Sequence, residues 1–353
     1  MKLPLILAQA AWVTISQAQQ VPQAVPFSTG FNSSFSLTAA QIDAAGLSKT
    51  LASSINAIVN FDRSSLANGG PRQDDFYNVP PKKSNLQAGQ ALKIQQVTDP
   101  TPYAIPAGSS LSKILYTTRN VNGTIIPASA YVLWPFVPRQ FHGEAKGSDR
   151  KAHAVLWAHG TSGYFADAAP SSHRTLYYEH IMPLALVQAG YAVVAPDYAG
   201  LGLEKSWDGS EIPHQYFASS AGGQDALYAM QAALEAFRDR LSDEFAIMGH
   251  SQGGGVAWSA AELLALERDG EFKTLIKGYK GTIAIAPVTK TLSPPSFSAL
   301  VASLRISSIF PDFDPSQWLH PLALNRAKLL QEIQGGATVA QQLFLSEELD
   351  APS

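Results

Sequence analysis

The chain has 353 residues, of which 46% are hydrophobic and 15% charged, and its formal net charge at pH 7 is -3. This composition is typical of a globular protein with a sizeable core, either one large domain or a domain with an insertion. The slightly acidic balance provides no basic field for nucleic acid. The absence of cysteine excludes disulfides, thiol chemistry and cysteine-based zinc sites.

The N-terminus, MKLPLILAQAAWVTISQAQQ, has one lysine followed by a largely apolar stretch from Leu3 to Ile15. Ser16 and Ala18 place small residues where a signal peptidase that cuts after Ala18 requires them. We therefore predict a secretory signal peptide over residues 1–18, and hence a secreted, extracellular protein. The alternative is a buried N-terminal helix. The apolar stretch is shorter than the roughly 20 residues that span a bilayer, and no later segment reads as a transmembrane helix.

Residues 19–90 are rich in Ser, Ala, Gln, Asn and Pro, and we expect short helices and loops that wrap a core formed by later residues. Asn-x-Ser/Thr sequons begin at Asn32 and Asn122. In the secretory route both are candidate glycosylation sites, although such tripeptides also arise by chance.

A β-hairpin is predicted in the next part of the chain. Two apolar, β-branched and aromatic runs, Leu111–Arg119 and Ile125–Pro135, lie on either side of an Asn-Val-Asn-Gly stretch that ends at Gly123. Asn-Gly between two such runs is a strong hairpin signal. Leu92–Thr98 is a possible strand before the hairpin.

From residue 152 onward, short apolar strands alternate with helical patterns. The expected strands are Ala154–Ala158, Tyr191–Pro196, Phe245–Met248 and Gly281–Pro287, and the expected helices are Tyr177–Gln188, Asp225–Phe237 and Val256–Glu267. This alternation predicts an α/β fold, with a mostly parallel sheet flanked by helices. After Val288 the pattern becomes helical or irregular, with amphipathic helices expected at Phe297–Leu304 and Leu322–Ile333.

The strongest chemical signal is the pentapeptide Gly-His-Ser-Gln-Gly at 249–253, between a predicted strand and a predicted helix. A sharp strand-to-helix turn holds its central serine in a strained conformation, so the residues two before and two after it must be small. Gly249 and Gly253 meet this requirement, and we predict Ser251 to be a nucleophile. The alternative is a glycine-rich turn with an incidental serine.

A second segment, His159-Gly160-Thr161, ends an earlier predicted strand, where a serine hydrolase builds half of its oxyanion hole. Gly160 permits a loop that aims a backbone N–H into the cleft. We predict backbone donors from Gly160, Thr161 and Gln252. We interpret the His159 side chain as a strand-end histidine satisfied by hydrogen bonds.

Other polar residues receive structural interpretations. Asp225 is expected near the N-terminus of a helix, where the helix dipole favours a carboxylate. No metal site is predicted, because the histidines between these motifs lack metal-ligand spacing: His173, His180 and His214.

Three ordered stretches resemble the secretory lipase family, of the lipase A type, in the α/β-hydrolase superfamily. They are HGTSGYFADAAPSSH (159–173), GYAVVAPDYAGLG (190–202) and GHSQGGGVAW (249–258). The preceding hairpin is also similar, so the resemblance covers roughly residues 90–290. It implies an α/β-hydrolase core over 91–288, a partial helical cap over 289–353, and hydrolysis of small-molecule or lipid carboxylic esters without a cofactor. Where many relatives have Cys-Ala-Pro-Ser, this chain has Ala-Ala-Pro-Ser.

The departure from this pattern concerns the acid and the base, which in the superfamily follow the nucleophile on loops after later strands. His320 is the only histidine after Ser251, and the acids there include Asp269, Asp312, Asp314 and Asp350. Three interpretations remain open. In the first, the chain is truncated. In the second, His320 serves as the base with Asp314 or Asp312 as the acid. In the third, the fold is kept as a non-catalytic binding or accessory module, because a serine without a base is a poor nucleophile. A further enzymatic alternative is a hydrolase or acyl-transfer enzyme for a small-metabolite ester or lactone.

Overall fold

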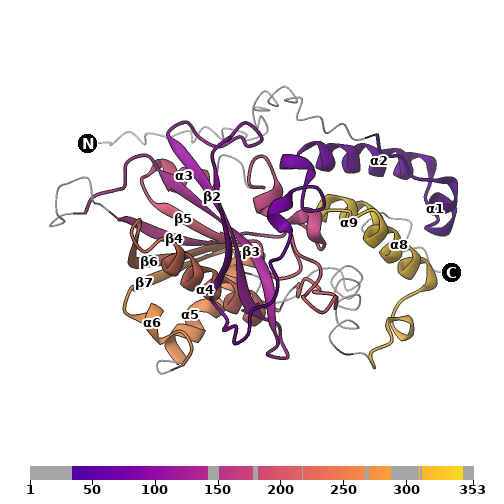
Figure 1. Cartoon of the computed structure of the whole chain (residues 1–353). Coiled ribbons are helices and arrows are strands. Elements are labelled where there is room, and N and C mark those ends of the chain that lie inside the picture. Colours follow the sequence, from indigo (N-terminus) through magenta and orange to yellow (C-terminus); the bar gives the residue numbers. More distant parts are fainter. Residues whose placement is uncertain are drawn as a thin grey trace, which may run out of the picture.

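The computed structural model describes residues 34–141, 151–177, 182–216, 218–266, 270–287, 310 and 312–344. Asn32, the predicted signal peptide at 1–18 and the helix expected at 297–304 lie outside the described residues. Figure 1 shows a twisted sheet flanked by helices, with a second group of helices to one side of it.

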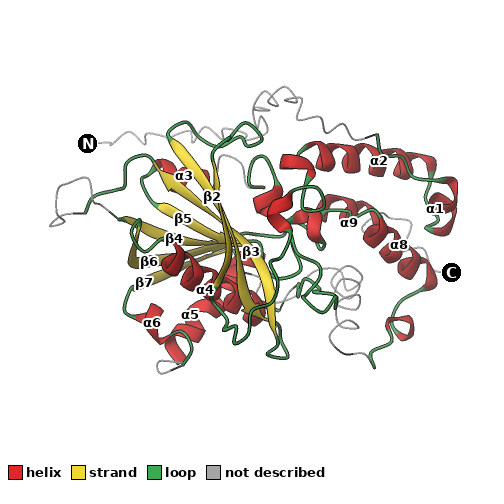
Figure 2. Cartoon of the chain, viewed as in Figure 1, coloured by secondary structure: helices red, strands yellow, loops and turns green. Residues whose placement is uncertain are grey.

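The described strands form one seven-stranded sheet with the order β1-β2-β3-β5-β4-β6-β7. The pairs from β1 to β5 are antiparallel, and the pairs from β5 to β7 are parallel. The bounds are β1 Ala91–Val97, β2 Ser109–Arg119, β3 Ile125–Pro135, β4 Ala152–Ala158, β5 Ala192–Pro196, β6 Leu241–His250 and β7 Tyr279–Ile285. The predicted class, an α/β fold with helices flanking the sheet, is confirmed (Figure 2).

The predicted hairpin is formed by β2 and β3, with residues 120–124 as its loop. The Asn120 side chain accepts hydrogen bonds from the backbone N–H groups of Asn122 (3.1 Å) and Thr124 (3.2 Å). Gly123 has φ 82°, in the left-handed region that glycine adopts most readily. Asn122 is therefore exposed at the tip of an ordered turn.

The α-helices of the described residues are α1 Ala39–Ala44, α2 Lys49–Ser64, α3 Leu184–Gln188, α4 Ser219–Ala236, α5 Gln252–Leu266, α6 Lys273–Ile276, α8 Pro321–Glu332 and α9 Ala337–Phe344. Helices α4 and α5 pack against one face of the sheet, and α3 packs against the other. Within β5, Val194 belongs to the first of these cores and its neighbour Val193 to the second, because successive strand residues point to opposite faces. Small residues let α4 and α5 approach closely: a Cβ on Gly222 would lie 2.5 Å from Val256 Cγ2.

Helices α1, α2, α8 and α9 share a separate hydrophobic cluster, which we call the helical layer (Figure 1). The buried guanidinium of Arg326, in α8, joins its parts. It donates hydrogen bonds to the carbonyl oxygens of Ala45 (3.0 Å) and Gly46 (3.3 Å), between α1 and α2. It also donates to Leu343 O, in α9, at 2.7 Å. The layer therefore brings together segments from the two ends of the described chain.

Two expected helices differ from those observed, and one observed helix was not expected. The helix predicted from Tyr177 begins only at Leu184: Tyr177 has φ 68°, and Pro183, which has no N–H to donate, precedes α3. Helix α4 begins at Ser219, six residues before its expected start, because its early glycines weaken the helical pattern. Helix α9 was not predicted.

Candidate active site

Ser251 lies at the junction of β6 and α5, in the position expected for a nucleophile. Its φ is 57°, so a non-glycine residue adopts the left-handed region at this turn. The flanking glycines are required for space. A Cβ on Gly249 would lie 2.0 Å from Gly253 O, and a Cβ on Gly253 would lie 2.0 Å from Ala158 O. The turn can therefore form only because both positions lack a side chain.

Backbone hydrogen bonds hold this turn on both sides. The N–H of Ser251 donates to Ile285 O, at the end of β7, at 2.9 Å. The carbonyl of Ser251 accepts from the N–H groups of Gly254 (2.9 Å) and Gly255 (3.2 Å), which begin the first turn of α5. The half-buried serine is thus displayed at the carboxyl edge of the parallel strands.

The predicted oxyanion loop lies next to this turn. Strands β4 and β6 run parallel, and Ala158 pairs with Gly249, so the segments that follow the two strands leave the sheet at the same edge. Gly160 is buried and Thr161 half-buried; the Thr161 hydroxyl hydrogen-bonds to the Tyr216 hydroxyl at 2.8 Å. Gln252 opens α5, and the first N–H groups of a helix have no partner within the helix. The structure therefore places the three predicted donor residues around the serine turn.

A buried stack of rings lies behind the site. The His159 ring stacks on Tyr198 with centroids 4.2 Å apart, and Tyr198 stacks on His214 at 6.0 Å. Burial lowers the pKa of His159 to about 4, which keeps the ring neutral at ordinary pH. His214 lies in no recognisable sequence motif, so its position in the stack could not be predicted from the sequence. The interpretation of His159 as a residue held by hydrogen bonds agrees with its ring nitrogens, which lie 2.6 Å from Gly160 O and 3.2 Å from Asp197 O. The neutral ring has one N–H and donates to one of these carbonyls.

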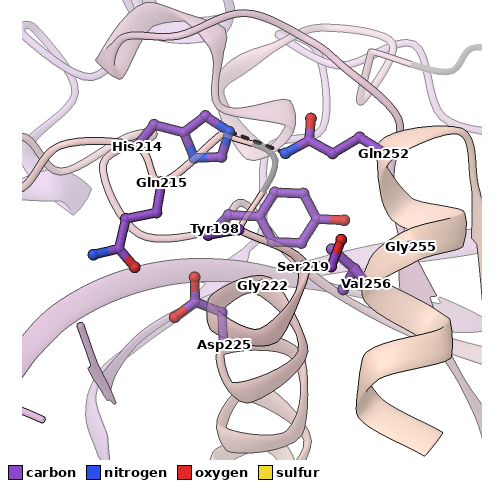
Figure 3. Close-up of a pocket in the computed structure, with 10 residues that line it drawn as sticks. Tyr198, His214, Gln215, Ser219, Gly222, Asp225, Gln252, Gly255 and Val256 are labelled. Carbon is purple, nitrogen blue, oxygen red and sulfur yellow. Dashed lines mark hydrogen bonds between the residues drawn. The ribbon is translucent and has the colours of Figure 1, made fainter. Parts of the chain in front are cut away.

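Figure 3 shows a small cavity of about 20 Å³ beside this stack, lined among others by Tyr198, His214, Asp225 and Gln252. The side chains of His214 and Gln252 point toward one another across it, with their terminal nitrogens 3.1 Å apart. The Gln252 side chain is 8% exposed, and its Oε1 has no hydrogen-bond partner among the described residues.

Two buried carboxylates organise the strand ends around the stack. Asp197 accepts hydrogen bonds from the hydroxyls of Ser129 (2.6 Å) and Ser171 (2.5 Å). Asp225 accepts from the Thr118 hydroxyl at 2.6 Å and from the N–H of Ala199 at 2.8 Å. Burial raises the pKa of Asp197, and it raises that of Asp225 to about 7.

The expected role of Asp225 at a helix N-terminus is wrong. Because α4 begins at Ser219, Asp225 lies in the second turn of the helix, and its carboxylate faces buried donors of β2 and of the loop after β5. Desolvation, rather than the helix dipole, dominates its pKa.

The candidate acid and base are both exposed, and each caps a helix. The Asp314 carboxylate accepts from Ser316 N–H at 2.9 Å, which lowers its pKa. His320 is the N-cap of α8, and its Nδ1 accepts from Leu322 N–H at 3.3 Å. In the described part of the chain, no hydrogen bond or ion pair joins Asp314, His320 and Ser251 to one another. Asp269 and Asp350 lie outside the described residues.

The described residues hold no group of three or more histidine, cysteine or acidic residues arranged to bind a metal ion. None of their helices is both long and apolar enough to cross a membrane.

A sequence model of the Alpha/beta hydrolase family matches residues 155–350. The match spans more than half of the chain, so the chain belongs to the α/β-hydrolase family. No curated protein matches the sequence.

Solved structures provide more specific similarities. One is the rice cell wall degrading esterase LipA from Xanthomonas oryzae: 20% of residues are identical, the TM-score is 0.51, and the match covers 76% of this chain and 71% of that one. Another is Candida antarctica lipase A in its closed state, with 17% identity, a TM-score of 0.51, and coverage of 80% of this chain and 62% of that one. At these identities the likeness is one of fold, and at that level the expected resemblance to the lipase A type is confirmed.

Proposed function

We propose that the chain is a secreted serine hydrolase that cleaves carboxylic esters through an acyl-enzyme on Ser251. The observation that carries the proposal is the left-handed backbone of Ser251, at a strand-to-helix turn whose flanking glycines leave no room for a Cβ. A fold has no need of such a strained residue, and strain of this kind concentrates at functional sites. The esterase and lipase with similar folds support the ester class of substrate.

In the proposed reaction, Ser251 Oγ attacks the ester carbonyl carbon and loses its proton to a base. The negative charge that develops on the carbonyl oxygen is stabilised by backbone N–H groups of Gln252 and of the Gly160–Thr161 loop. The C–O bond then breaks, the leaving alcohol takes up the proton, and the acyl group remains on Ser251. Water attacks this acyl-enzyme in the same way, releasing the acid and regenerating the serine.

The candidate base of this reaction is His320, with Asp314 as the candidate acid. In the described cap, His320 Nδ1 accepts a hydrogen bond from Leu322 N–H, so the proton of the neutral ring is on Nε2. If His320 acts, the ring must give up this bond and take the other tautomer, with the proton on Nδ1, so that Nε2 can receive the serine proton. Asp314 would then have to leave its own capping contact to orient the ring. We propose the pair only as the candidate that the described residues offer.

A second function is favoured by one observation: no side chain in the described ranges hydrogen-bonds to Ser251 Oγ. A serine without a base keeps its ordinary, high pKa and reacts slowly. The competing proposal is a non-catalytic binding or accessory protein with a hydrolase fold. The exposed Asn122 supports glycosylation, and with it extracellular location, under either function.

A fluorophosphonate probe separates the two functions. We expect it to label wild type and Ser251→Ala to abolish the labelling. Ser259→Ala, a matched serine substitution in α5, the helix that follows Ser251, should label normally. Absence of labelling in folded wild-type protein would reject the hydrolase and favour the binding module. Loss of labelling in His320→Ala would assign the base, and full labelling would exclude His320.

A further inference from the structure

The structure links the two segments that supply the proposed oxyanion donors, and the link is made by side chains outside both. We infer that Tyr198 and His214 are positioning residues: they hold the His159–Thr161 loop and the first turn of α5 at a set separation. The inference rests on the proposed function, because that separation matters only if both segments bind one developing oxyanion.

The contact between His214 and Gln252 has a defined direction. His214 Nδ1 lies 3.1 Å from Ala199 O, and a carbonyl oxygen only accepts, so Nδ1 carries the proton. The neutral ring then has a lone pair on Nε2, which accepts from the Gln252 side-chain NH₂ at 3.1 Å (Figure 3). His214 is 2% exposed, so this hydrogen bond is made away from solvent.

The hydrogen bond to His214 sets the orientation of the Gln252 side-chain amide. Its Oε1 is buried and finds no donor among the described residues. A buried acceptor left without a partner is unfavourable, so the hydrogen bond to His214 decides the orientation. The side chain of Gln252 is thereby anchored on the opposite wall of the cavity, and its own backbone N–H is the proposed oxyanion donor.

Tyr198 provides the link to the other donor segment. Its hydroxyl donates to His159 O at 2.9 Å, one residue before Gly160. Its ring stacks on the rings of both His159 and His214, and it is nearly parallel to His214, at 10°. Tyr198 itself has φ 70°, a left-handed conformation that is unfavourable for a residue with a side chain. The chain thus holds this ring in place at the expense of backbone strain.

Donor placement is sensitive to such links. An oxyanion donor must lie within about 0.5 Å of its productive position, and loss of one donor lowers kcat by roughly 10²–10³-fold. A change in the separation of the two segments should therefore reduce the rate of the chemical step. It should leave binding of the probe unchanged, since binding precedes charge development.

The decisive variant is Gln252→Met. It keeps the backbone N–H and the side-chain volume, removes the bond to His214, and also removes the unpartnered Oε1. The matched control is Gln215→Met, the same change in a residue that lines the same cavity. The hydrogen bond of Gln252 is made to His214 and not to Gln215. Tyr198→Phe keeps the ring stack and removes the hydroxyl bond to His159 O.

The measurement is the kinetics of phosphonylation of Ser251 by a fluorophosphonate, in which the Oγ–P bond forms and fluoride leaves. For Gln252→Met and Tyr198→Phe we expect the maximal rate constant to fall at least about 10-fold, toward the roughly 10²-fold limit of donor loss. The half-saturating probe concentration, the fraction of sites labelled and, for Gln252→Met, the melting temperature should stay near wild type.

The outcomes distinguish this inference from the proposed function. If wild type is labelled and Gln252→Met reacts with an unchanged rate constant, the inference is overturned and the proposed hydrolase function still stands. An equal fall in Gln215→Met also overturns it, because the effect then belongs to the cavity and not to the link. Wild type that folds but does not react overturns both, since there is then no oxyanion to position.

Discussion

Replacing Ser251 by glycine should make the protein more stable than replacing it by alanine, although both variants lose the proposed nucleophile. The reason is the φ of 57° at this position. A residue with a Cβ in the left-handed region costs roughly 1–2 kcal/mol. Glycine avoids this cost but loses more conformational freedom on folding, by roughly 0.5–1 kcal/mol. The net advantage of Ser251→Gly over Ser251→Ala is therefore about 1 kcal/mol.

The assay is urea denaturation of both variants, with the free energy of unfolding extrapolated to water. A difference of about 1 kcal/mol corresponds to only about 1–2 °C in melting temperature for a chain of 353 residues, so the free energy is the better readout. Ser259, in the regular part of α5, offers a control of opposite sign. There glycine should be less stable than alanine by about 1 kcal/mol. If Ser251→Ala equals or exceeds Ser251→Gly in stability, the nucleophile turn is not strained as described.

Three other predictions concern the supporting structure. In the folded protein Asp225 keeps its proton up to a pH of about 7, whereas its ordinary pKa is 3.8. The free energy of unfolding should therefore fall as the pH rises between these values, by at most about 4 kcal/mol. Asp225→Asn should make the free energy of unfolding nearly independent of pH between pH 4 and 7, and an unchanged slope would contradict this. Gly253→Ala forces a Cβ to 2.0 Å from Ala158 O and should abolish probe labelling or soluble expression, whereas normal labelling would refute the clash. Arg326→Met removes the donor of two buried carbonyls, Ala45 O and Leu343 O, and of the part-buried Gly46 O. It should cost about 3 kcal/mol or more in urea denaturation, against less than about 0.5 kcal/mol for the exposed Arg238→Met.

Local chemistry made several features of this protein predictable. The hairpin follows from Asn-Gly between two strand-forming runs, because that turn depends on residues adjacent in the chain. The nucleophile turn is predictable for the same reason. The space around Ser251 is limited by Gly249 and Gly253, two residues away on either side, and both glycines are visible in the sequence.

The miss at Asp225 shows where such reasoning fails. A carboxylate near the expected start of a helix fits the helix dipole, but the true start lies at Ser219. What governs Asp225 is burial against Thr118, a residue of a distant strand. Its raised pKa follows from that burial, and burial is a property of the assembled sheet and helices.

The sequence by itself determined the class of this protein and the serine that would act, because strand periodicity, helix periodicity and glycine sterics operate over a few residues. Only the tertiary structure decided what surrounds that serine. His214 meets Gln252 across 38 positions of the chain, and Arg326 meets Ala45 across 281. Such contacts are selected by the packing of whole elements into one core, and no local pattern of residues encodes which side chains will meet there.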